Sequence, residues 1–428
     1  MLRRPGLRAL LIDPEPLRRD PEFRLVWSAQ LVASLGRQVV LVALPFQLWE
    51  ATHSPLSLSL LALVNLVPLV VLSLGAGALA DAVDQRRLMI ATQAGLAVTA
   101  AGLAMTAVPA PSLPAIYLVA LAGAVVAAID APARKSALYR TVARERMAKA
   151  AALEQTAMQA ASVCGPTLGG VLIAAVGLRP AYIVVAVGLT AGLAVLARLR
   201  PIPALAGAAR PTLAAIAEGF AFTRQVPIIL ATFVIDLDAM IFGLPVALFP
   251  ILATDVFHAG PAGLGLLTSA PAAGALVGVL VSGWAGRVRA SGRAVVIAVL
   301  AWGVAICLFG LVTSWLALGL VFLAVAGAAD VFSAVFRGTI VQLSVPDALR
   351  GRVSAMHVLV VSGGPRLGDV EATLVAAATS ATFSVVSGGL LCIAGAAWVA
   401  WRFPQLLGYR AGAPTATAAR AARPGEAR

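Results

Sequence analysis

Long apolar stretches alternate with short polar connections along most of the chain. Each stretch holds about 20 mostly apolar residues, the length that an α-helix needs to cross the hydrocarbon core of a bilayer. Backbone groups in lipid must be hydrogen-bonded internally, so each stretch is expected to be a helix. The pattern predicts an all-α membrane protein with twelve transmembrane helices. We place them at Phe23–Leu48, Leu56–Ala80, Leu88–Val108, Leu113–Ala137, Ala148–Ala175, Ala181–Leu199, Val226–Leu252, Gly263–Gly286, Ala294–Val312, Trp315–Val341, Val353–Ala378 and Phe383–Phe403.

The longest polar interruption divides these spans into two sets of six. Five segments follow from it: an N-terminal segment (1–22), a first six-helix half (23–199), a linker (200–225), a second half (226–403) and a tail (404–428). The tail is a low-complexity mixture of Ala, Thr, Arg and Pro, and we expect it to be disordered.

One sequence pattern occurs in the corresponding helix of each half. The fifth span contains GPTLGG at Gly165–Gly170, and the eleventh contains GPRLGD at Gly364–Asp369. Two repeated halves are typical of transporters that rock about a site near the middle of the bilayer. The repetition therefore predicts a transporter with two pseudo-symmetric halves.

Composition and charge agree with a membrane protein. Hydrophobic residues make up 60% of the chain and charged residues 12%, with a net charge of +13. Almost all lysines and arginines fall at the termini and in the connections on the same side of the membrane as the termini. The connections on the opposite side contain one basic residue, Arg179. Basic residues favour the cytosolic side, so we expect a cell-membrane protein with both termini in the cytosol. The positive charge thus reports topology and does not indicate nucleic-acid binding. The basic segment 1–22 lacks the apolar region of a signal peptide, so the first helix is expected to be retained.

The chain carries none of the motifs that would indicate an enzyme. It has no nucleotide-binding glycine loop, no dinucleotide fingerprint and no nucleophile motif. Its three histidines and three cysteines do not occur at metal-ligand spacing. We therefore expect no cofactor, no bound metal and no direct use of ATP.

Ionisable side chains inside the spans are candidates for a transport pathway. A charge in a transmembrane helix costs about 2.5–3.5 kcal/mol on insertion scales, so such residues usually have a function. The first span carries a polar stripe around Arg37 that cannot face lipid. The candidate pathway residues are Arg37, Gln30, Ser34, Gln38, Asp130, Glu154, Asp236, Asp238, Asp330, Arg366, Asp369 and Glu371.

Several of these charges also have a structural interpretation. Arg366 and Asp369, three positions apart on a helix, can neutralise each other. Asp130 and Glu154 lie near the ends of their spans and can pair with Arg134 or Lys149.

The seventh span carries two aspartates, Asp236 and Asp238, without a basic neighbour in the same helix. One of them is expected to pair with Arg37. The other would then be a desolvated carboxylate that is suited to carry a proton. Asp330 is the alternative proton carrier.

The loop after the second span resembles that of the major facilitator superfamily. Residues 77–87 read GALADAVDQRR, which matches the family pattern at Gly77, Leu79, Asp81 and Arg86 and departs from it at Ala82, Asp84 and Gln85. The GPTLGG run is similar to the helix-five motif of exporters in this superfamily. Residues 346–353, PDALRGRV, resemble the branch that exports siderophores and macrolides.

The resemblance implies roles for two sets of residues. Gly77, Asp81, Arg86 and Arg87 would form a gating loop that holds the cytosolic side shut. Gly165, Pro166, Gly169 and Gly170 would bend the fifth helix, seal the cavity against ion leak and favour export. The structural alternative is that these glycines only let two helices pack closely.

These observations favour a secondary active exporter of a small amphipathic molecule, such as a siderophore, antibiotic or metabolite. It would work by alternating access and proton antiport, most simply as a monomer in contact with lipid. A nutrient importer or a uniporter on the same fold is the first alternative. A membrane sensor or assembly factor without transport activity is the second.

Overall fold

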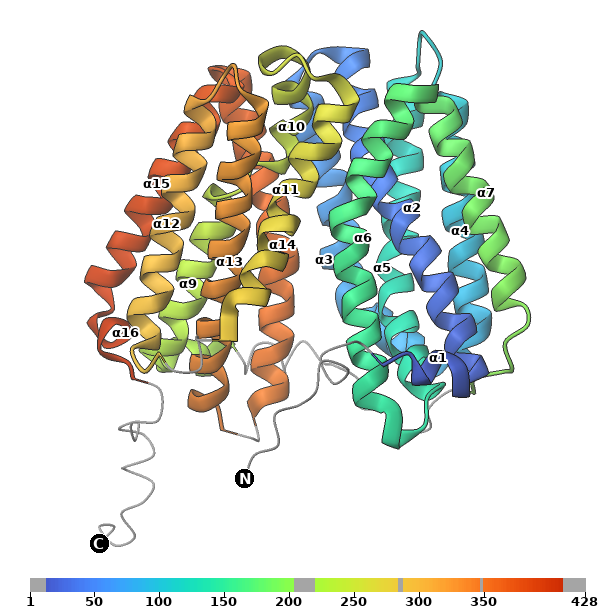
Figure 1. Cartoon of the computed structure of the whole chain (residues 1–428), viewed down its shortest axis with the longest axis horizontal. Coiled ribbons are helices and arrows are strands. Elements are labelled where there is room, and N and C mark those ends of the chain that lie inside the picture. The colour runs from blue at the N-terminus through green and yellow to red at the C-terminus, as the bar shows by residue number, and fades with distance from the viewer. Residues whose placement is uncertain (1–12, 204–219, 284–287, 347–348, 411–428) are drawn as a thin grey trace, which may run out of the picture. The chain divides into compact units, whose positions relative to one another are not determined.

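The computed structural model describes residues 13–203, 220–283, 288–346 and 349–410; the side chains of residues 73–81, 355 and 359 lie outside this description. All regular elements of the described residues are helices (Figure 1). They belong to two compact units, Met1–Pro211 with Val246–Ala272 (unit 1) and Thr212–Pro245 with Ala273–Arg428 (unit 2).

Unit 1 consists of a short helix, six long helices and a segment from later in the chain. The long helices are α2 (Pro21–Thr52), α3 (Pro55–Ala82), α4 (Gln85–Thr106), α5 (Leu113–Arg140), α6 (Met147–Val176) and α7 (Leu178–Leu196). The short helix α1 (Glu15–Arg19) precedes them, and the 3-10 turn η2 (Arg144–Arg146) connects α5 to α6. The later segment contains η3 (Val246–Leu248), α10 (Phe249–Ile251), the π-helical turn η4 (Leu252–Val256) and the beginning of α11 (Gly260–Val281).

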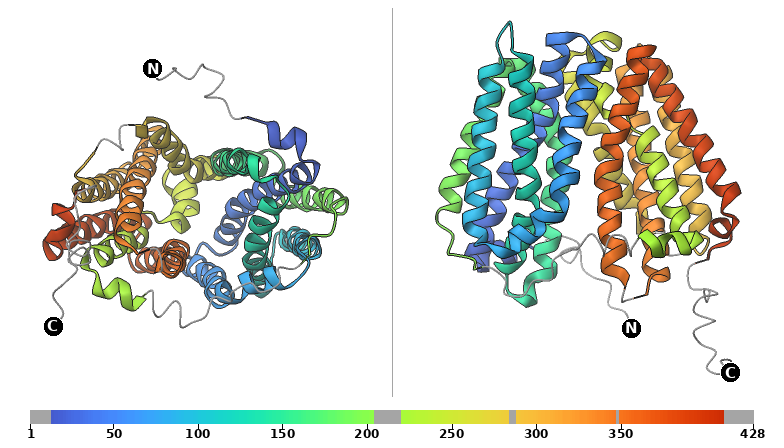
Figure 2. Two further views of the ribbon diagram at one scale, coloured as in Figure 1. Left: turned by 90° about the horizontal axis from the view of Figure 1, so that it is seen from below. Right: turned by 180° about the vertical axis from the view of Figure 1, so that it is seen from behind.

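Unit 2 contains the rest of α11 and five more long helices. These are α9 (Pro227–Phe242), α12 (Ser291–Leu311), α13 (Leu316–Ser344), α14 (Arg350–Ala378) and α15 (Ala381–Arg402), followed by the short α16 (Pro404–Gly408). α16 falls in the segment whose composition predicts disorder, and its Leu406 is fully buried. Figure 2 shows the helices of each unit from two further sides.

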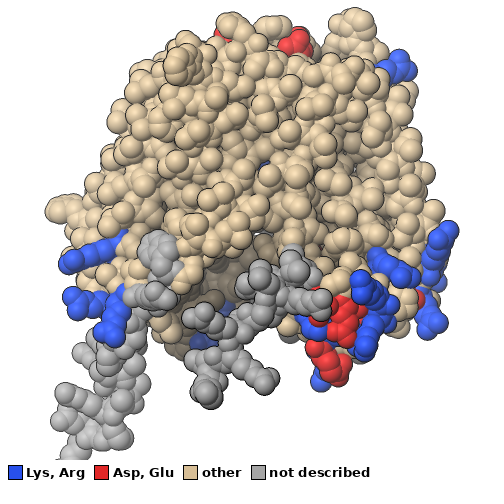
Figure 3. All heavy atoms as spheres, in the orientation of Figure 1, with Lys and Arg blue, Asp and Glu red and all other residues tan. Residues whose placement is uncertain are grey.

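The described residues contain eleven helical stretches that are long and apolar enough to cross a membrane. α14 is long enough to be the twelfth, since 29 residues span about 44 Å. Large side chains such as Val98, Val71 and Trp401 are exposed on the flanks. On the face seen in Figure 3, uncharged side chains cover the middle and basic side chains gather near the lower edge. The chain is thus a multi-pass membrane protein of the predicted all-α class.

The seventh span is broken, contrary to the continuous helix predicted from Val226 to Leu252. α9 ends at Phe242, and the chain resumes a helical course only at Val246. Pro245 lacks the N–H that a continuous helix would use, and the nearby Gly243 further lowers the helix propensity of this segment. The indole Nε1 of Trp302 donates a 2.7 Å hydrogen bond to the carbonyl of Gly243. This bond satisfies a backbone group that has no partner in its own helix, as a break at membrane depth requires.

Packing inside unit 1 is apolar at the end near α1 and polar at mid-height. Phe23 and Val26 of α2 pack with Met89, Leu138 and Leu196 of the neighbouring helices, and all five are fully buried or nearly so. Farther along α2, this core gives way to the buried polar side chains described next.

Candidate functional site

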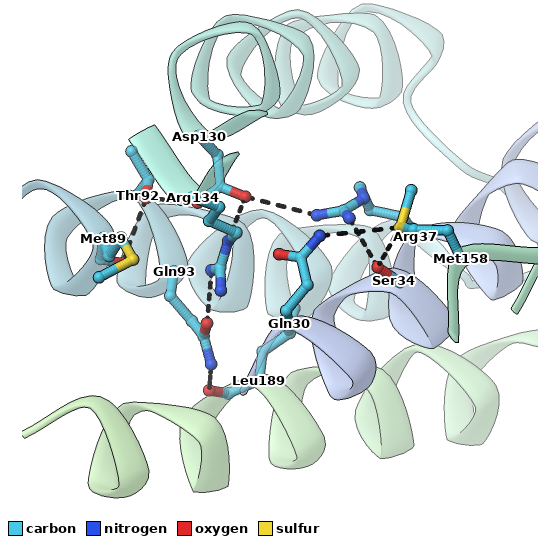
Figure 4. A network of polar contacts seen from close by, with 10 residues as sticks. All are labelled: Gln30, Ser34, Arg37, Met89, Thr92, Gln93, Asp130, Arg134, Met158 and Leu189. Carbon is cyan, nitrogen blue, oxygen red and sulfur yellow. Dashed lines mark hydrogen bonds and ion pairs between the residues drawn. The ribbon is translucent and has the colours of Figure 1, made fainter. Parts of the chain in front are cut away.

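Polar side chains of the stripe on α2 contact α6 (Figure 4). The spacing in the sequence predicts that they share one face of the helix, but not which helix that face meets. Gln30 Nε2 and Ser34 Oγ lie 3.8 and 3.5 Å from the sulfur of Met158. One turn farther on, Gln38 donates a 3.3 Å hydrogen bond to Ser162. These contacts keep polar groups away from the lipid-facing side of the helix.

Two arginines and one aspartate meet beside this stripe, in a group that we call the Asp130 centre (Arg37, Asp130 and Arg134). Arg134 Nε lies 2.6 Å and Arg37 Nη1 3.4 Å from the same oxygen of Asp130, whose side chain is fully buried. Thr92 donates to the other oxygen at 2.6 Å. Arg134 also donates to Gln93 at 2.6 Å, and Gln93 donates to a backbone carbonyl of α7 (Figure 4).

The partner predicted for Arg37 was wrong. We expected an aspartate of the seventh span, but Arg37 pairs with Asp130 of α5. The reason is that Asp130 lies deeper in the bundle than its place near the end of the predicted span suggested, level with the middle of α2. The predicted pair of Asp130 with Arg134 is confirmed.

Glu154 lies at the other end of the stripe and does not pair with Lys149, which was one of its predicted partners. Lys149 instead contacts Asp13 and Glu15, at 2.7 and 2.5 Å. A small pocket between α2 and α6 is lined by Trp27, Gln30, Leu31, Ser34, Glu154, Ala157 and Met158. Within the described part of the chain, one buried polar atom of Trp27, Gln30 and Glu154 each has no hydrogen-bond partner.

Unit 2 contains a second charged group, the Arg337 centre (Asp236, Asp330 and Arg337). Arg337 Nη1 lies 2.6 Å from Asp236, and its Nη2 lies 4.0 Å from Asp330. Arg337 and Asp236 are 7% and 3% exposed at their side chains, whereas Asp330 is 40% exposed. One guanidinium therefore serves two carboxylates, the reverse of the Asp130 centre.

A cavity of about 270 Å³ opens beside the Arg337 centre. Its lining includes Phe233, Asp236, Arg337, Arg350 and His357. Phe233 and His357 meet edge to face with ring centroids 5.9 Å apart. The cavity therefore offers both charges, an imidazole and an aromatic ring to a ligand.

The other predicted charges of unit 2 lie apart from this cavity's lining. Asp238 faces Gly395 of α15, and its Oδ2 is buried without a hydrogen-bond partner among the described residues. Arg366 lies 3.4 Å from Asp369, which confirms the predicted pair. Glu371 follows two residues after Asp369 and is partly exposed.

The glycines of α6 lie in close contact with neighbouring helices, Gly165 against a side chain and Gly169 and Gly170 against backbone. A Cβ on Gly165 would lie 2.5 Å from Gln38 Cβ, and one on Gly169 would lie 3.1 Å from Val39 Cα. Gly170 and Gly265 of α11 leave each other so little room that a Cβ on Gly170 would lie 2.9 Å from Gly265 Cα. Pro166, inside the helix, contributes its carbonyl to this contact. A hydrogen bond of 2.7 Å between Thr167 and Ser269 continues the contact between α6 and α11.

Gly77 and Asp81 of the predicted gating loop belong to residues 73–81, whose side-chain surroundings lie outside the description. Arg86 donates a 2.8 Å hydrogen bond to the carbonyl of Ala197, which fixes the start of α4 against the end of α7. The amide of Arg87 donates to Asp84, the N-cap of α4. Asp84, one of the positions where the sequence departs from the family pattern, thus caps the start of α4.

A contact between α2 and the later segment of unit 1 was not predicted. Trp49 near the end of α2 is 4% exposed, and its Nε1 donates to Asp255 at 3.3 Å. Asp255 belongs to the π-helical turn Leu252–Val256, a conformation that often marks functional positions. A tryptophan near the end of a span is usually interpreted as an interface anchor, so nothing in the sequence indicates this pair.

Acidic residues before α2 attach α1 to the α5–α6 connection. Arg146 donates two hydrogen bonds of 2.7 Å to Asp20, and these lower the pKa of Asp20 below its ordinary value of 3.8. The hydrogen bonds from Lys149 likewise lower the pKa values of Asp13 and Glu15. The N-terminal segment is therefore held by charge at the end of unit 1 that carries α1.

Comparison with known proteins identifies the family. The family model "transmembrane secretion effector" (MFS_3) matches residues 14–411. The enterobactin exporter EntS of Citrobacter koseri is 30% identical over 390 residues, which cover 89% of this chain and 93% of the relative. The same exporter of Shigella flexneri is 28% identical over 391 residues, covering 90% and 93%.

Solved structures agree with the fold. The nucleoside transporter NupG has a TM-score of 0.72 at 15% identity, covering 91% of this chain and 99% of that one. A POT family transporter has a TM-score of 0.71 at 11% identity, covering 90% and 97%. Together with the long apolar helices and the repeated glycine pattern, these matches show that the chain belongs to the transmembrane secretion effector family of the major facilitator superfamily, and is a transporter of small molecules and not an enzyme.

Proposed function

We propose that this protein exports a small amphipathic molecule across the inner membrane by alternating access, in exchange for protons. Both termini would lie in the cytosol, as the distribution of arginines indicates. The names of the curated relatives support export and make enterobactin the first substrate to test. The Arg337 centre supports the coupling to protons.

The charge balance of the Arg337 centre is the observation that carries this proposal. A guanidinium stays protonated in proteins, so one arginine can neutralise only one of two carboxylates. Asp236 lies 2.6 Å from Arg337 and is nearly inaccessible, while Asp330 lies 4.0 Å away and is 40% exposed at its side chain. An unpaired carboxylate in a membrane helix is costly, and a bound proton removes that cost.

Asp330 is therefore the proposed site of proton exchange, and Asp236 keeps Arg337 in place. The sequence favours an aspartate of the seventh span as the proton carrier and Asp330 as the alternative, so their ranks are exchanged in this proposal. Protonation of Asp330 would leave Arg337 with Asp236 alone. The cavity beside the centre would then present the ion pair of Arg337 and Asp236, which has no net charge, to the ligand.

Flux measurements in proteoliposomes test the proposal. With an imposed pH gradient, enterobactin or a macrolide should accumulate in inside-out vesicles, and a protonophore should abolish the accumulation. Asp330→Asn should lose the dependence on the gradient while retaining exchange of substrate across the membrane. Glu50→Gln removes an exposed carboxylate of α2 and serves as the matched control. Gradient-independent flux in the unmodified protein would indicate a uniporter, and movement in the opposite direction would indicate an importer.

A further inference from the structure

The Asp130 centre carries more positive than negative charge. Within unit 1, two guanidiniums share the single carboxylate of Asp130. Arginine does not lose its proton in proteins, so the three groups carry a net positive charge. Arg37 lies about 24 Å along α2 from its first residue, which places this charge near the middle of the span.

The two arginines are not equally satisfied. Arg134 is 3% exposed at its side chain and makes two contacts of 2.6 Å, to Asp130 and Gln93. The oxygens of Asp130 are taken by Arg134 and Thr92 at that distance, so Arg37 is left with a contact of 3.4 Å. The side chain of Arg37 is 34% exposed, and its Nη2 donates to Ser34 at 2.9 Å. Arg37 is therefore the less tightly paired and the more exposed of the two arginines, although Nη1 of Arg134 is also buried without a hydrogen-bond partner among the described residues.

The pocket beside the stripe holds about 10 Å³, room for about one water and not for the body of a ligand, and Arg37 is not part of its lining. Ser34 lines the small pocket that also contains Trp27 and Met158, an aromatic ring and a thioether. The indole Nε1 of Trp27 is a buried donor without a partner among the described residues. Glu154 lines the same pocket at the level of Gln30, two helical turns or about 10 Å along α2 from Arg37. Among the described residues Glu154 makes no ion pair with Arg37, so it does not neutralise that charge.

From the two arginines that share Asp130, we propose that Arg37 binds small organic anions. The ligand has one acidic group that contacts the guanidinium of Arg37. This inference rests on the proposed export function and narrows its substrate class to molecules with an acidic group. The anion supplies the negative charge that the Asp130 centre lacks in the bilayer.

Binding of a matched pair of probes tests the inference without any gradient. Calorimetry on the purified protein at constant pH compares 2-naphthoate with 2-naphthamide, which has the same ring and no charge. We expect 2-naphthoate to bind at least about tenfold more tightly. Arg37→Gln should weaken its binding by about 10- to 100-fold, the range for a hydrogen bond to a charged group. Arg37→Lys, which keeps the charge, should retain part of the preference.

A control on the same helix separates this site from general charge effects. Arg24→Gln removes an exposed arginine of α2 and should leave the binding of both probes unchanged. Arg37→Gln should unfold at the same temperature as the unmodified protein, because Arg134 and Asp130 remain paired. Equal affinity for the two probes, no saturable binding in the millimolar range, or an unchanged preference in Arg37→Gln would each overturn the inference.

The two proposals fail separately. If flux does not depend on a pH gradient but 2-naphthoate binds through Arg37, the protein is an anion carrier without proton coupling. If flux is proton-coupled but Arg37 does not affect the naphthoate preference, the export function stands and the anion site is wrong.

Discussion

The contact between Gly170 and Gly265 gives the sharpest prediction about the packing of unit 1. In Gly170→Ala, the new methyl carbon would lie 2.9 Å from Gly265 Cα and 3.0 Å from Gly265 N. Carbon atoms pack best at about 3.5–4.0 Å, so the backbones of α6 and α11 would have to separate by several tenths of an ångström or more. No side chain can move aside, because the neighbouring atoms belong to the backbone.

The expected loss of stability follows from two opposing effects. Overpacking of a tight contact costs about 1–3 kcal/mol. Alanine gains up to about 1 kcal/mol over glycine inside a helix. We therefore expect Gly170→Ala to lower the free energy of unfolding by about 1–2 kcal/mol, measured by thermal or SDS-induced unfolding in detergent micelles.

Gly188→Ala in α7 is the matched control. Its methyl carbon would lie 3.5 Å from Val32 Cγ1, an ordinary contact, so this variant should be unchanged or slightly more stable. A Gly170→Ala protein at least as stable as Gly188→Ala would refute the reasoning. It would mean that α6 and α11 are not in backbone contact in the folded protein.

Three further predictions concern charges and the α6–α11 contact. Asp130→Asn should lower the free energy of unfolding by about 3–5 kcal/mol, because it leaves two arginines without a counter-ion; unfolding in detergent measures this. The hydroxyl oxygens of Thr167 and Ser269 lie 2.7 Å apart, so the double variant Thr167→Cys and Ser269→Cys, in a background without native cysteines, should form a disulfide. This disulfide fixes α6 to α11, and we expect it to block transport until it is reduced. Asp20→Asn should lower the free energy of unfolding by about 0.5–1 kcal/mol near neutral pH. Because Arg146 lowers the pKa of Asp20, that difference should persist above about pH 4 and disappear as the pH falls below 3.8.

The cross-link and the Asp20 prediction each have an internal check. A disulfide between Gln47→Cys and Thr106→Cys, whose side chains lie 3.2 Å apart within unit 1, should form without affecting transport. If it blocks transport as well, the first cross-link reports general rigidity and not the α6–α11 contact. For Asp20, a difference that grows as the pH falls would have the wrong sign for a carboxylate stabilised in its charged form.

Much of the fold was predictable because the bilayer restricts what each segment can be. The apolar stretches locate the spans to within a few residues, and α2 runs from Pro21 to Thr52 where Phe23–Leu48 was expected. The break after Phe242 was missed, although Gly243 and Pro245 were visible in the sequence. Hydropathy alone does not reveal the break, because the residues on both sides of it are apolar.

The candidate site was only partly predictable, because pairing depends on how deep each residue lies. The stripe on α2 was found by helical spacing, but the partner of Arg37 was not. Arg337 was overlooked because it lies near the end of the predicted tenth span. The internal repeat held the missing signal: Arg134 and Arg337 occur the same number of residues after the first residue of α5 and α13. Comparing the halves position by position would have led from Arg134 to Arg337.

The assignment of Val246–Ala272 to unit 1 has a consequence for how the protein is made. The six helices of the first half are synthesised well before this segment, so the glycine face of α6 has no packing partner until α11 has been made. At about 5–20 residues per second, the delay is on the order of 5–20 seconds. During that interval the membrane insertion machinery or lipid must cover Gly170. Unit 1 is therefore completed only after synthesis of the second half has begun, and a gene divided at the linker would produce a first fragment without its final packing partner.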